Sequence, residues 1–281
     1  MTPPRQILLF LAIIVGVGLP MSWLMVRLGG LAGPYADAFV LGGMWLPGLS
    51  AMATRLIAVR SLAGLSWRLG AARYFGLAYL LPLIYGGAPF VIAVAGGHGR
   101  WTTAGWAQAA ASHGLSPDAM VGLAALLTVD VVGNLAGSLG EEIGWRGFLV
   151  PALSRSLGFW GVATVSWLIW FAFHLPILLT TGYRPAETPL WMSLLAFAAM
   201  LFPVSVILAW LRLRSASLWP AALAHAAHNA FILDLFGPAV VPTPATPWLV
   251  AEFGAITPLA AFAVMVLLLR LGGVPRISAQ T

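Results

Sequence analysis

Long apolar runs dominate this chain, and most are close to the length of a membrane-spanning helix. A helix needs about 20 apolar residues to cross the ~30 Å hydrocarbon core of a bilayer. Eight runs can be recognised, at about Ile7–Val26, Ala38–Met52, Tyr74–Ala95, Met120–Leu153, Phe159–Leu179, Leu190–Leu211, Leu218–Phe236 and Trp248–Leu271. We therefore expect an all-α fold, a polytopic membrane helix bundle with about eight transmembrane helices.

The composition excludes most other classes of protein. Of the 281 residues, 60% are hydrophobic and only 8% are charged, whereas a typical soluble domain has about 25% charged residues. A disordered chain, a fibre, a nucleic-acid-binding domain and a soluble enzyme are all inconsistent with these values. The loops are too short to hold a soluble domain, so we expect one integral membrane domain over residues 1–281. There is no cysteine, which excludes disulfides, thiolate metal sites and a cysteine nucleophile.

The distribution of arginines predicts the topology. All basic residues are arginines, and they lie mainly between the apolar runs, where they act as topology signals. With eight spans, one side receives Arg5, Arg55, Arg60, Arg68, Arg73, Arg146, Arg155, Arg212, Arg214, Arg270 and Arg276, and the other receives Arg27, Arg100 and Arg184. The positive-inside rule then predicts a multi-pass protein of the cell membrane with both termini in the cytoplasm.

One segment, residues 116–154, is too long for a single span. As one helix it would measure about 58 Å, so it must protrude, tilt or break. A helix start is expected at Ser116, Pro117 and Asp118, with Ser116 as the cap. The expected weak points are Gly133, Gly137 and Gly140, with Pro151 as the stop.

The most polar residues of the apolar chain lie in this same segment. Glu141 and Glu142 are adjacent, and a charge at the centre of a membrane helix costs about 2.5–3.5 kcal/mol, so such carboxylates are functional by default. Arg146 stands four residues after Glu142 and can pair with it on one helix face. Asp130, Asn134 and Glu141 form a polar stripe that should face the bundle interior.

Two later runs contain histidines at positions expected inside the membrane. His174 follows the aromatic segment that begins at Trp170. His225 and Asn229 lie one turn apart on a single helix face, with His228 close to them. The remaining histidines, His98 and His113, lie in the loop expected at residues 96–116 and look incidental.

Taken together, these motifs resemble the CPBP family of CAAX proteases and bacteriocin-processing proteins, also called the ABI family, which includes the type II CAAX prenyl endopeptidase. The resemblance covers residues 120–232, which would form the catalytic core. It rests on Glu141, Glu142 and Arg146 in the first motif, on His174 in the second, and on His225 and Asn229 in the third. The second motif departs from the family pattern, because Trp170 stands where the family has Phe.

The resemblance implies an intramembrane endopeptidase that hydrolyses a peptide bond in a membrane-associated or lipidated peptide or protein. Glu141 would be the general base that activates water, and Glu142 and Arg146 would position it. His174 would orient the water. His225 and Asn229 would donate hydrogen bonds to the developing oxyanion.

A metal-dependent mechanism is the alternative that the residues leave open. Glu141, His174 and His225 could supply a zinc site with an open position for water. The motif H-E-x-x-H of soluble metalloproteases is absent. We favour the mechanism without a metal, which requires no cofactor. If the protein does use a metal ion, zinc is the expected one. The expected partners are the peptide or protein substrate and the lipid bilayer, with no nucleic acid.

Other functions fit parts of the pattern. Intramembrane Glu, Asp and His residues also build proton relays in transporters, although no internal repeat is evident here. A non-catalytic scaffold or immunity protein could keep the same fold. Glu142 and Arg146 could also be a purely structural ion pair.

Overall fold

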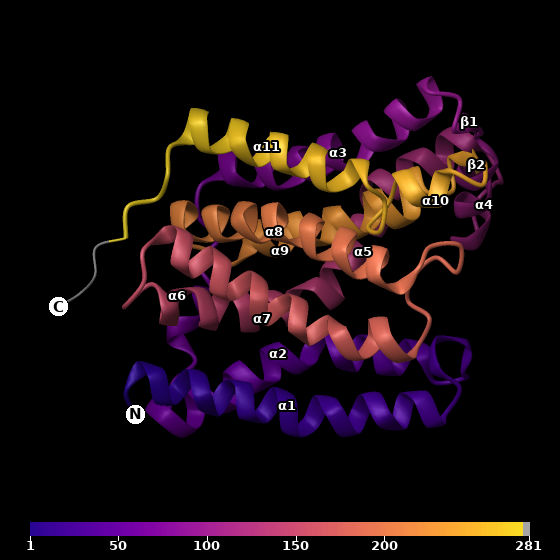
Figure 1. Ribbon diagram of the computed structural model, residues 1–281. Coiled ribbons are helices and arrows are strands. Elements are labelled where there is room, and N and C mark those ends of the chain that lie inside the picture. Colours follow the sequence, from indigo (N-terminus) through magenta and orange to yellow (C-terminus); the bar gives the residue numbers. More distant parts are fainter. Residues whose placement is uncertain (278–281) are drawn as a thin grey trace.

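The computed structural model describes residues 1–277 and is a bundle of long, roughly antiparallel helices (Figure 1). Six helical segments are long and apolar enough to cross a membrane: α1 (Pro3–Arg27), α2 (Ala36–Val59), α3 (Ala72–Ala95), the segment Ala119–Leu153, α7 (Phe159–Thr180) and α8 (Leu190–Ser215). Five of these agree with the predicted runs within four residues at each end, whereas α2 continues to Val59, beyond the predicted end at Met52. The predicted all-α membrane bundle is therefore confirmed.

Two shorter helical segments correspond to the remaining predicted spans. Helix α9 (Trp219–Asn229) continues directly into a π-helical turn, η4 (Ala230–Phe236). The last helix, α11 (Ile256–Gly272), is shorter than predicted, because Trp248 belongs to a separate turn of helix, α10 (Thr246–Leu249), and residues 250–255 are irregular. The predicted start of this span was therefore wrong.

The chain passes along the bundle an even number of times. Residue 1 and the end of α11 lie at one end of the bundle, and α4 (Ala104–Ser112), α10 and two short strands lie at the other (Figure 1).

The prediction that residues 96–116 form a plain loop was wrong. Strand β1 (Gly99–Trp101) pairs antiparallel with β2 (Val240–Pro242), and α4 forms from an alanine-rich stretch. Three-residue strands are too short to show an alternating pattern in the sequence.

The long segment Ala119–Leu153 begins and breaks in ways that differ from the prediction. Asp118, and not Ser116, caps the helix: its Oδ1 accepts hydrogen bonds from the backbone N–H groups of Met120 (2.8 Å) and Val121 (3.0 Å). Helix α5 (Ala119–Glu142) then widens into the π-helical turn η3 (Ile143–Leu149) before ending in α6 (Val150–Leu153). The irregularity follows Glu142 and does not lie at the predicted weak points Gly133, Gly137 and Gly140.

The glycines of this segment permit close packing against α2. A Cβ atom on Gly140 would lie 2.8 Å from Trp45 Cα, and one on Gly48 would lie 2.4 Å from the carbonyl oxygen of Gly140. Small residues at such crossings let two membrane helices approach closely. Gly133, in contrast, has no other part of residues 1–277 within 4 Å of its Cβ position, its own helix backbone and chain neighbours aside. The close contact anchors the α1–α2 pair to the helix that carries both glutamates.

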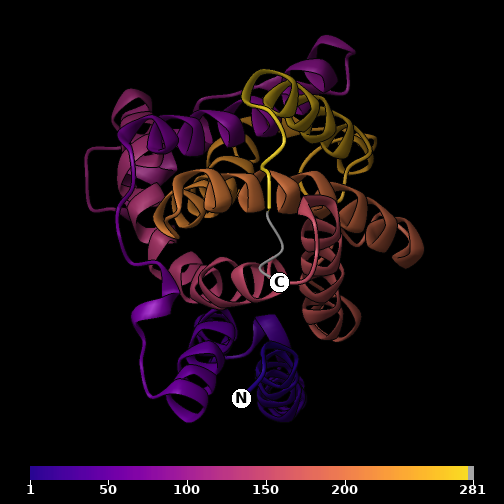
Figure 2. The same ribbon diagram turned by 90° about the vertical axis from the view of Figure 1, so that its left-hand side faces the viewer.

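Helix α9 lies in the middle of the bundle, where it packs against α5, α3 and α8. Viewed along the bundle, α1 and α2 form an outer layer on one side, and α3 and α11 lie on the opposite side (Figure 2). Five of the eleven residues of α9 are alanines with at most 1% exposed surface, so its neighbours approach its backbone closely. His225 is therefore buried, and Asn229 is half-buried.

Candidate active site

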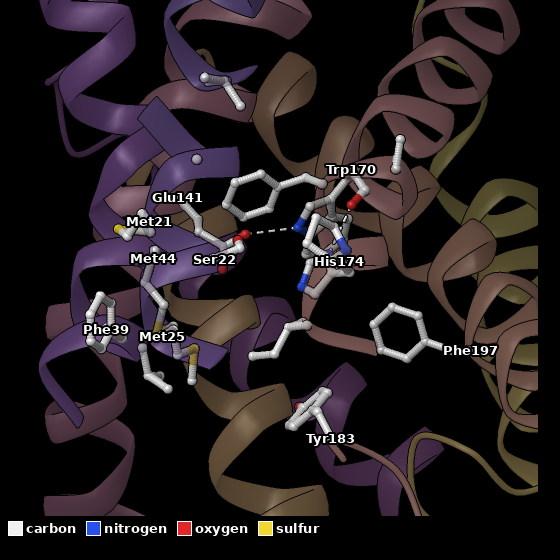
Figure 3. Close-up of a pocket in the computed structure, with 18 of the residues that line it drawn as sticks. Met21, Ser22, Met25, Phe39, Met44, Glu141, Trp170, His174, Tyr183 and Phe197 are labelled. Atoms are coloured by element: carbon white, nitrogen blue, oxygen red, sulfur yellow. Dashed lines mark hydrogen bonds between the residues drawn. The ribbon is translucent and has the colours of Figure 1, made fainter. Parts of the chain in front are cut away.

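A cavity with a volume of about 370 Å³ lies inside the bundle. Its polar wall is formed by residues from α5, α7, α9 and two loops, namely Asn134, Glu141, His174, Tyr183, His225, His228, Asn229 and Glu252. Its apolar wall is formed largely by α1 and α2, including Ile14, Gly18, Met21, Met25, Phe39, Val40 and Met44 (Figure 3). Residues far apart in the sequence therefore meet around one hollow.

Glu141 is held by two tryptophans. Its Oε2 accepts a hydrogen bond from Trp145 Nε1 (3.0 Å) on the following turn and another from Trp170 Nε1 (2.8 Å) on α7 (Figure 3). Only 4% of the residue is exposed. Its Oε1 has no hydrogen-bond partner among residues 1–277 and is not fully enclosed, because Glu141 lines the cavity. One oxygen is fixed, and the other is available to a molecule in the cavity.

Glu142 points away from the cavity into a buried ion pair. Its Oε1 accepts hydrogen bonds from Arg146 Nη1 (2.7 Å) and from His225 Nδ1 (3.0 Å). The Arg146 guanidinium also lies 4.3 Å from the centre of the Trp170 ring, a cation–π contact. Glu142 and Arg146 have no exposed surface. The pair therefore links α5 to α9 and orients His225, and it does not itself line the cavity.

His174 has a defined tautomer. Its Nδ1 lies 2.8 Å from the backbone carbonyl oxygen of Trp170, which can only accept a hydrogen bond, so Nδ1 carries the proton. In the neutral ring Nε2 is then an acceptor, and His174 lines the cavity. Trp170 thus fixes both Glu141 and His174.

His225 and Asn229 occupy the wall formed by α9. Because Glu142 accepts the hydrogen bond from His225 Nδ1, the other nitrogen, Nε2, can donate only when the ring is protonated. Asn229 is the last residue of α9 before the π-helical turn η4, just as Glu142 is the last residue of α5 before η3. Such turns are frequent at functional sites.

Of the predicted polar stripe Asp130, Asn134 and Glu141 on α5, only the last two residues line the cavity. Asn134 lines the cavity and donates to Asp234 Oδ2 (3.2 Å). Asp130 lies outside the cavity lining and pairs with His113 Nε2 at 3.0 Å. His113, which was expected to be incidental, is also outside the cavity lining; it follows α4 and connects that helix to α5.

The donor atoms do not form a metal site as they stand. Among residues 1–277, no three His, Asp or Glu side chains lie together in an arrangement that could hold a metal ion. The indole donors at Glu141 Oε2 also occupy one side of the proposed zinc ligand. Zinc binding by Glu141, His174 and His225 stays a prediction.

The sequence did not single out a second polar group on the cavity wall. Glu252 Oε2 accepts a hydrogen bond from the Tyr183 hydroxyl (2.7 Å), and Glu252 Oε1 lies 3.6 Å from His228 Nε2. His228 Nδ1 lies 2.9 Å from the Tyr85 hydroxyl. Burial, and then the Glu252 carboxylate, raise the pKa of Tyr183 well above its ordinary value, so this hydroxyl remains a donor. The sequence signal that could have identified this group is Glu252 itself, a single acidic residue within the apolar run Trp248–Leu271.

One comparison with known proteins identifies a relationship. Residues 123–231 match the family model described as "Type II CAAX prenyl endopeptidase Rce1-like". No curated protein matches the chain. The matched region contains the predicted residues from Glu141 to Asn229 and excludes Glu252, and it supports the resemblance expected from the motifs.

Proposed function

From the relationship to the CAAX-protease family, which supports an intramembrane protease, we propose that this protein is an endopeptidase that hydrolyses a peptide bond in a membrane-associated or lipidated peptide or protein. The observation that carries the proposal is the convergence of Glu141, His174 and His225, from three helices, on one cavity. Two indole N–H groups hold one oxygen of Glu141, so the other keeps a constant direction.

The proposed reaction begins with a water molecule between Glu141 Oε1 and His174 Nε2. Glu141 removes a proton as the water oxygen bonds to the scissile carbonyl carbon, and His174 accepts the second hydrogen as a hydrogen bond that orients the water. The carbonyl π electrons move to the oxygen, which becomes an oxyanion. When the C–N bond breaks, Glu141 returns the proton to the leaving amine, and the carboxylate is regenerated.

The oxyanion would be stabilised by His225 Nε2–H and by the side-chain amide of Asn229. His225 donates from Nε2 only as an imidazolium, and the surrounding charges favour that form. Glu141 and Glu142 carry two negative charges and Arg146 one positive charge, so one negative charge remains to be balanced. One donor of this kind is worth about 2.7–4 kcal/mol in other hydrolases.

The apolar wall supports a lipid-like or transmembrane substrate. Met21, Met25 and Met44 are flexible and polarizable, and they adapt to apolar groups of different shape (Figure 3). A substrate segment could lie against α1 and α2 while its peptide bond reaches Glu141. The proposed location is the cell membrane, with both termini in the cytoplasm.

Purified protein in detergent, incubated with a library of apolar peptides, tests the proposal. We expect hydrolysis by the wild type and a loss of at least about 1,000-fold in the Glu141→Gln variant, which should unfold at a similar temperature. Glu187→Gln is the matched control, because it removes an exposed carboxylate from a loop outside the cavity. Equal activity in the wild type and Glu141→Gln would refute the proposal.

A further inference from the structure

The cavity has a second carboxylate at a distance from the Glu142–Arg146 pair. Glu252 lies in the irregular segment before α11, lines the cavity, and is only 6% exposed. Its Oε2 is held by the Tyr183 hydroxyl at 2.7 Å. Its Oε1 accepts no hydrogen bond among residues 1–277 and is not fully enclosed, so it can take a donor from the cavity.

The groups behind Glu252 hold it in place. His228 Nε2 lies 3.6 Å from its Oε1, and the Tyr85 hydroxyl lies 2.9 Å from His228 Nδ1. If Tyr85 donates to Nδ1, the Nε2–H of a neutral His228 points toward the carboxylate, which avoids opposing a lone pair to a negative charge. The Tyr183 ring packs edge-on against Phe253 at 5.8 Å. The carboxylate is therefore preorganised.

The charges that line the cavity are unbalanced. Its charged residues, apart from three histidines, are Glu141 and Glu252, and no arginine is among the described residues that line it. Arg146 is fully buried and paired with Glu142. Arg184, beside Tyr183, donates instead to the carbonyl oxygen of Thr188 at 2.8 Å. With His225 as the proposed imidazolium, the charges of Glu141, Glu142 and Arg146 are balanced, and the carboxylate of Glu252 is left without a positive counterpart. A cation beside Glu252 is therefore attracted in this low-dielectric hollow.

We propose that Glu252, supported by Tyr183 and His228, forms a subsite for a cationic group of the peptide substrate, either a basic side chain or a free α-amine near the scissile bond. This inference rests on the proposed endopeptidase function. It makes Glu252 a specificity-determining residue, in a part of the chain beyond the family match at residues 123–231.

Paired peptides test the subsite in the purified full-length protein. Lysine is placed in turn at each position around the cleaved bond of an apolar peptide, and each peptide is compared with its norleucine counterpart. A free amino terminus is compared with an acetylated one, which separates the two sources of the cation. For one pair, we expect kcat/KM of the wild type to be about tenfold higher with the cationic peptide than with its uncharged counterpart. In Glu252→Gln this ratio should fall to about one, through a change in KM.

The controls separate recognition from folding. Glu252→Asp keeps the charge and should retain part of the preference, whereas Glu187→Gln should retain all of it. If Glu252→Gln does not fold, inhibition of the wild type by hexylamine and by hexanol is compared, and the amine should bind about tenfold more tightly. Equal inhibition by both compounds would overturn the subsite.

Two further outcomes count against the subsite and not against the protease. These are a ratio near one for every pair in the wild type, or a preference that persists in Glu252→Gln. If no peptide is hydrolysed, the endopeptidase proposal fails, and binding of the same pairs to Glu141→Ala decides the subsite. Equal affinity for the lysine and norleucine peptides would then overturn it.

Discussion

The indole N–H of Trp170 donates a 2.8 Å hydrogen bond to Glu141 Oε2. The two residues lie on different helices, α7 and α5, so this contact sets the position of the carboxylate relative to the α7 wall of the cavity. The same tryptophan receives the His174 Nδ1–H on its backbone carbonyl. Trp170, which stands where the family has Phe, therefore supplies a polar contact as well as an aromatic surface.

Replacing this indole should weaken catalysis without unfolding the protein. Trp170→Phe keeps an aromatic ring and removes one N–H donor to Glu141. A hydrogen bond to a charged group is worth about 1.5–3 kcal/mol, so kcat should fall by about tenfold or more. Trp167→Phe is the control, because its indole donates to the carbonyl oxygen of Ala198 and lies outside the cavity. The kcat of each variant is measured by peptide hydrolysis. An equal fall in kcat in Trp170→Phe and Trp167→Phe would contradict the role of Trp170.

The buried ion pair should be more sensitive to the loss of one partner than of both. Arg146→Gln leaves the Glu142 charge without its partner, and breaking a buried pair in this way costs about 3–5 kcal/mol. The double variant Glu142→Gln/Arg146→Gln removes both charges and should recover much of the lost stability. Thermal unfolding in detergent measures the difference. A double variant no more stable than Arg146→Gln would show that the charge imbalance is not the cause.

The contact between α2 and α5 should not tolerate a single added methyl group. In Gly48→Ala the new Cβ would meet the Gly140 carbonyl oxygen at 2.4 Å, so one helix must shift, at a typical cost of about 1–3 kcal/mol. Gly133→Ala is the matched control, because its Cβ position is open space among the described residues. The unfolding temperature should fall only for Gly48→Ala. Equal temperatures would contradict the close approach of the helices.

The proposed topology can be tested with single cysteines, because the chain has none of its own. Leu69, in the loop between α2 and α3, and Ala186, in the loop between α7 and α8, are exposed. These two loops lie at opposite ends of the bundle (Figure 1). In intact cells, a membrane-impermeant thiol reagent should label Ala186→Cys, whereas Leu69→Cys should react only after permeabilisation. The reverse pattern would place both termini outside the cytoplasm.

Much of the fold was predictable because apolar runs report membrane helices directly. The ends of α1, α3 and α7 lie within a few residues of the prediction. The paired strands β1 and β2 were not predictable, since their pairing joins segments far apart in the sequence. The start of α11 was also missed, because Trp248 continues the apolar run while the backbone turns.

The site was predictable where its residues recur at helical spacing. Glu142 and Arg146 meet as the spacing of four residues requires. Glu252 and Tyr183 lie in irregular segments, and only the tertiary structure places Glu252 beside Tyr183 and His228. The residues around Glu252 and Tyr183 in the sequence show no periodic pattern from which these two could have been predicted.

The widened turns η3 and η4 each accommodate more residues per turn than the helices they continue. Deleting one residue between Glu142 and Arg146, with the winding unchanged, would rotate every later residue by about 100° around the helix axis relative to α5. The Arg146 guanidinium would then shift from its present contacts with Glu142 and the Trp170 ring. The length of this stretch is thus as constrained as its composition, and a shortened chain could keep every named side chain and still lose their alignment.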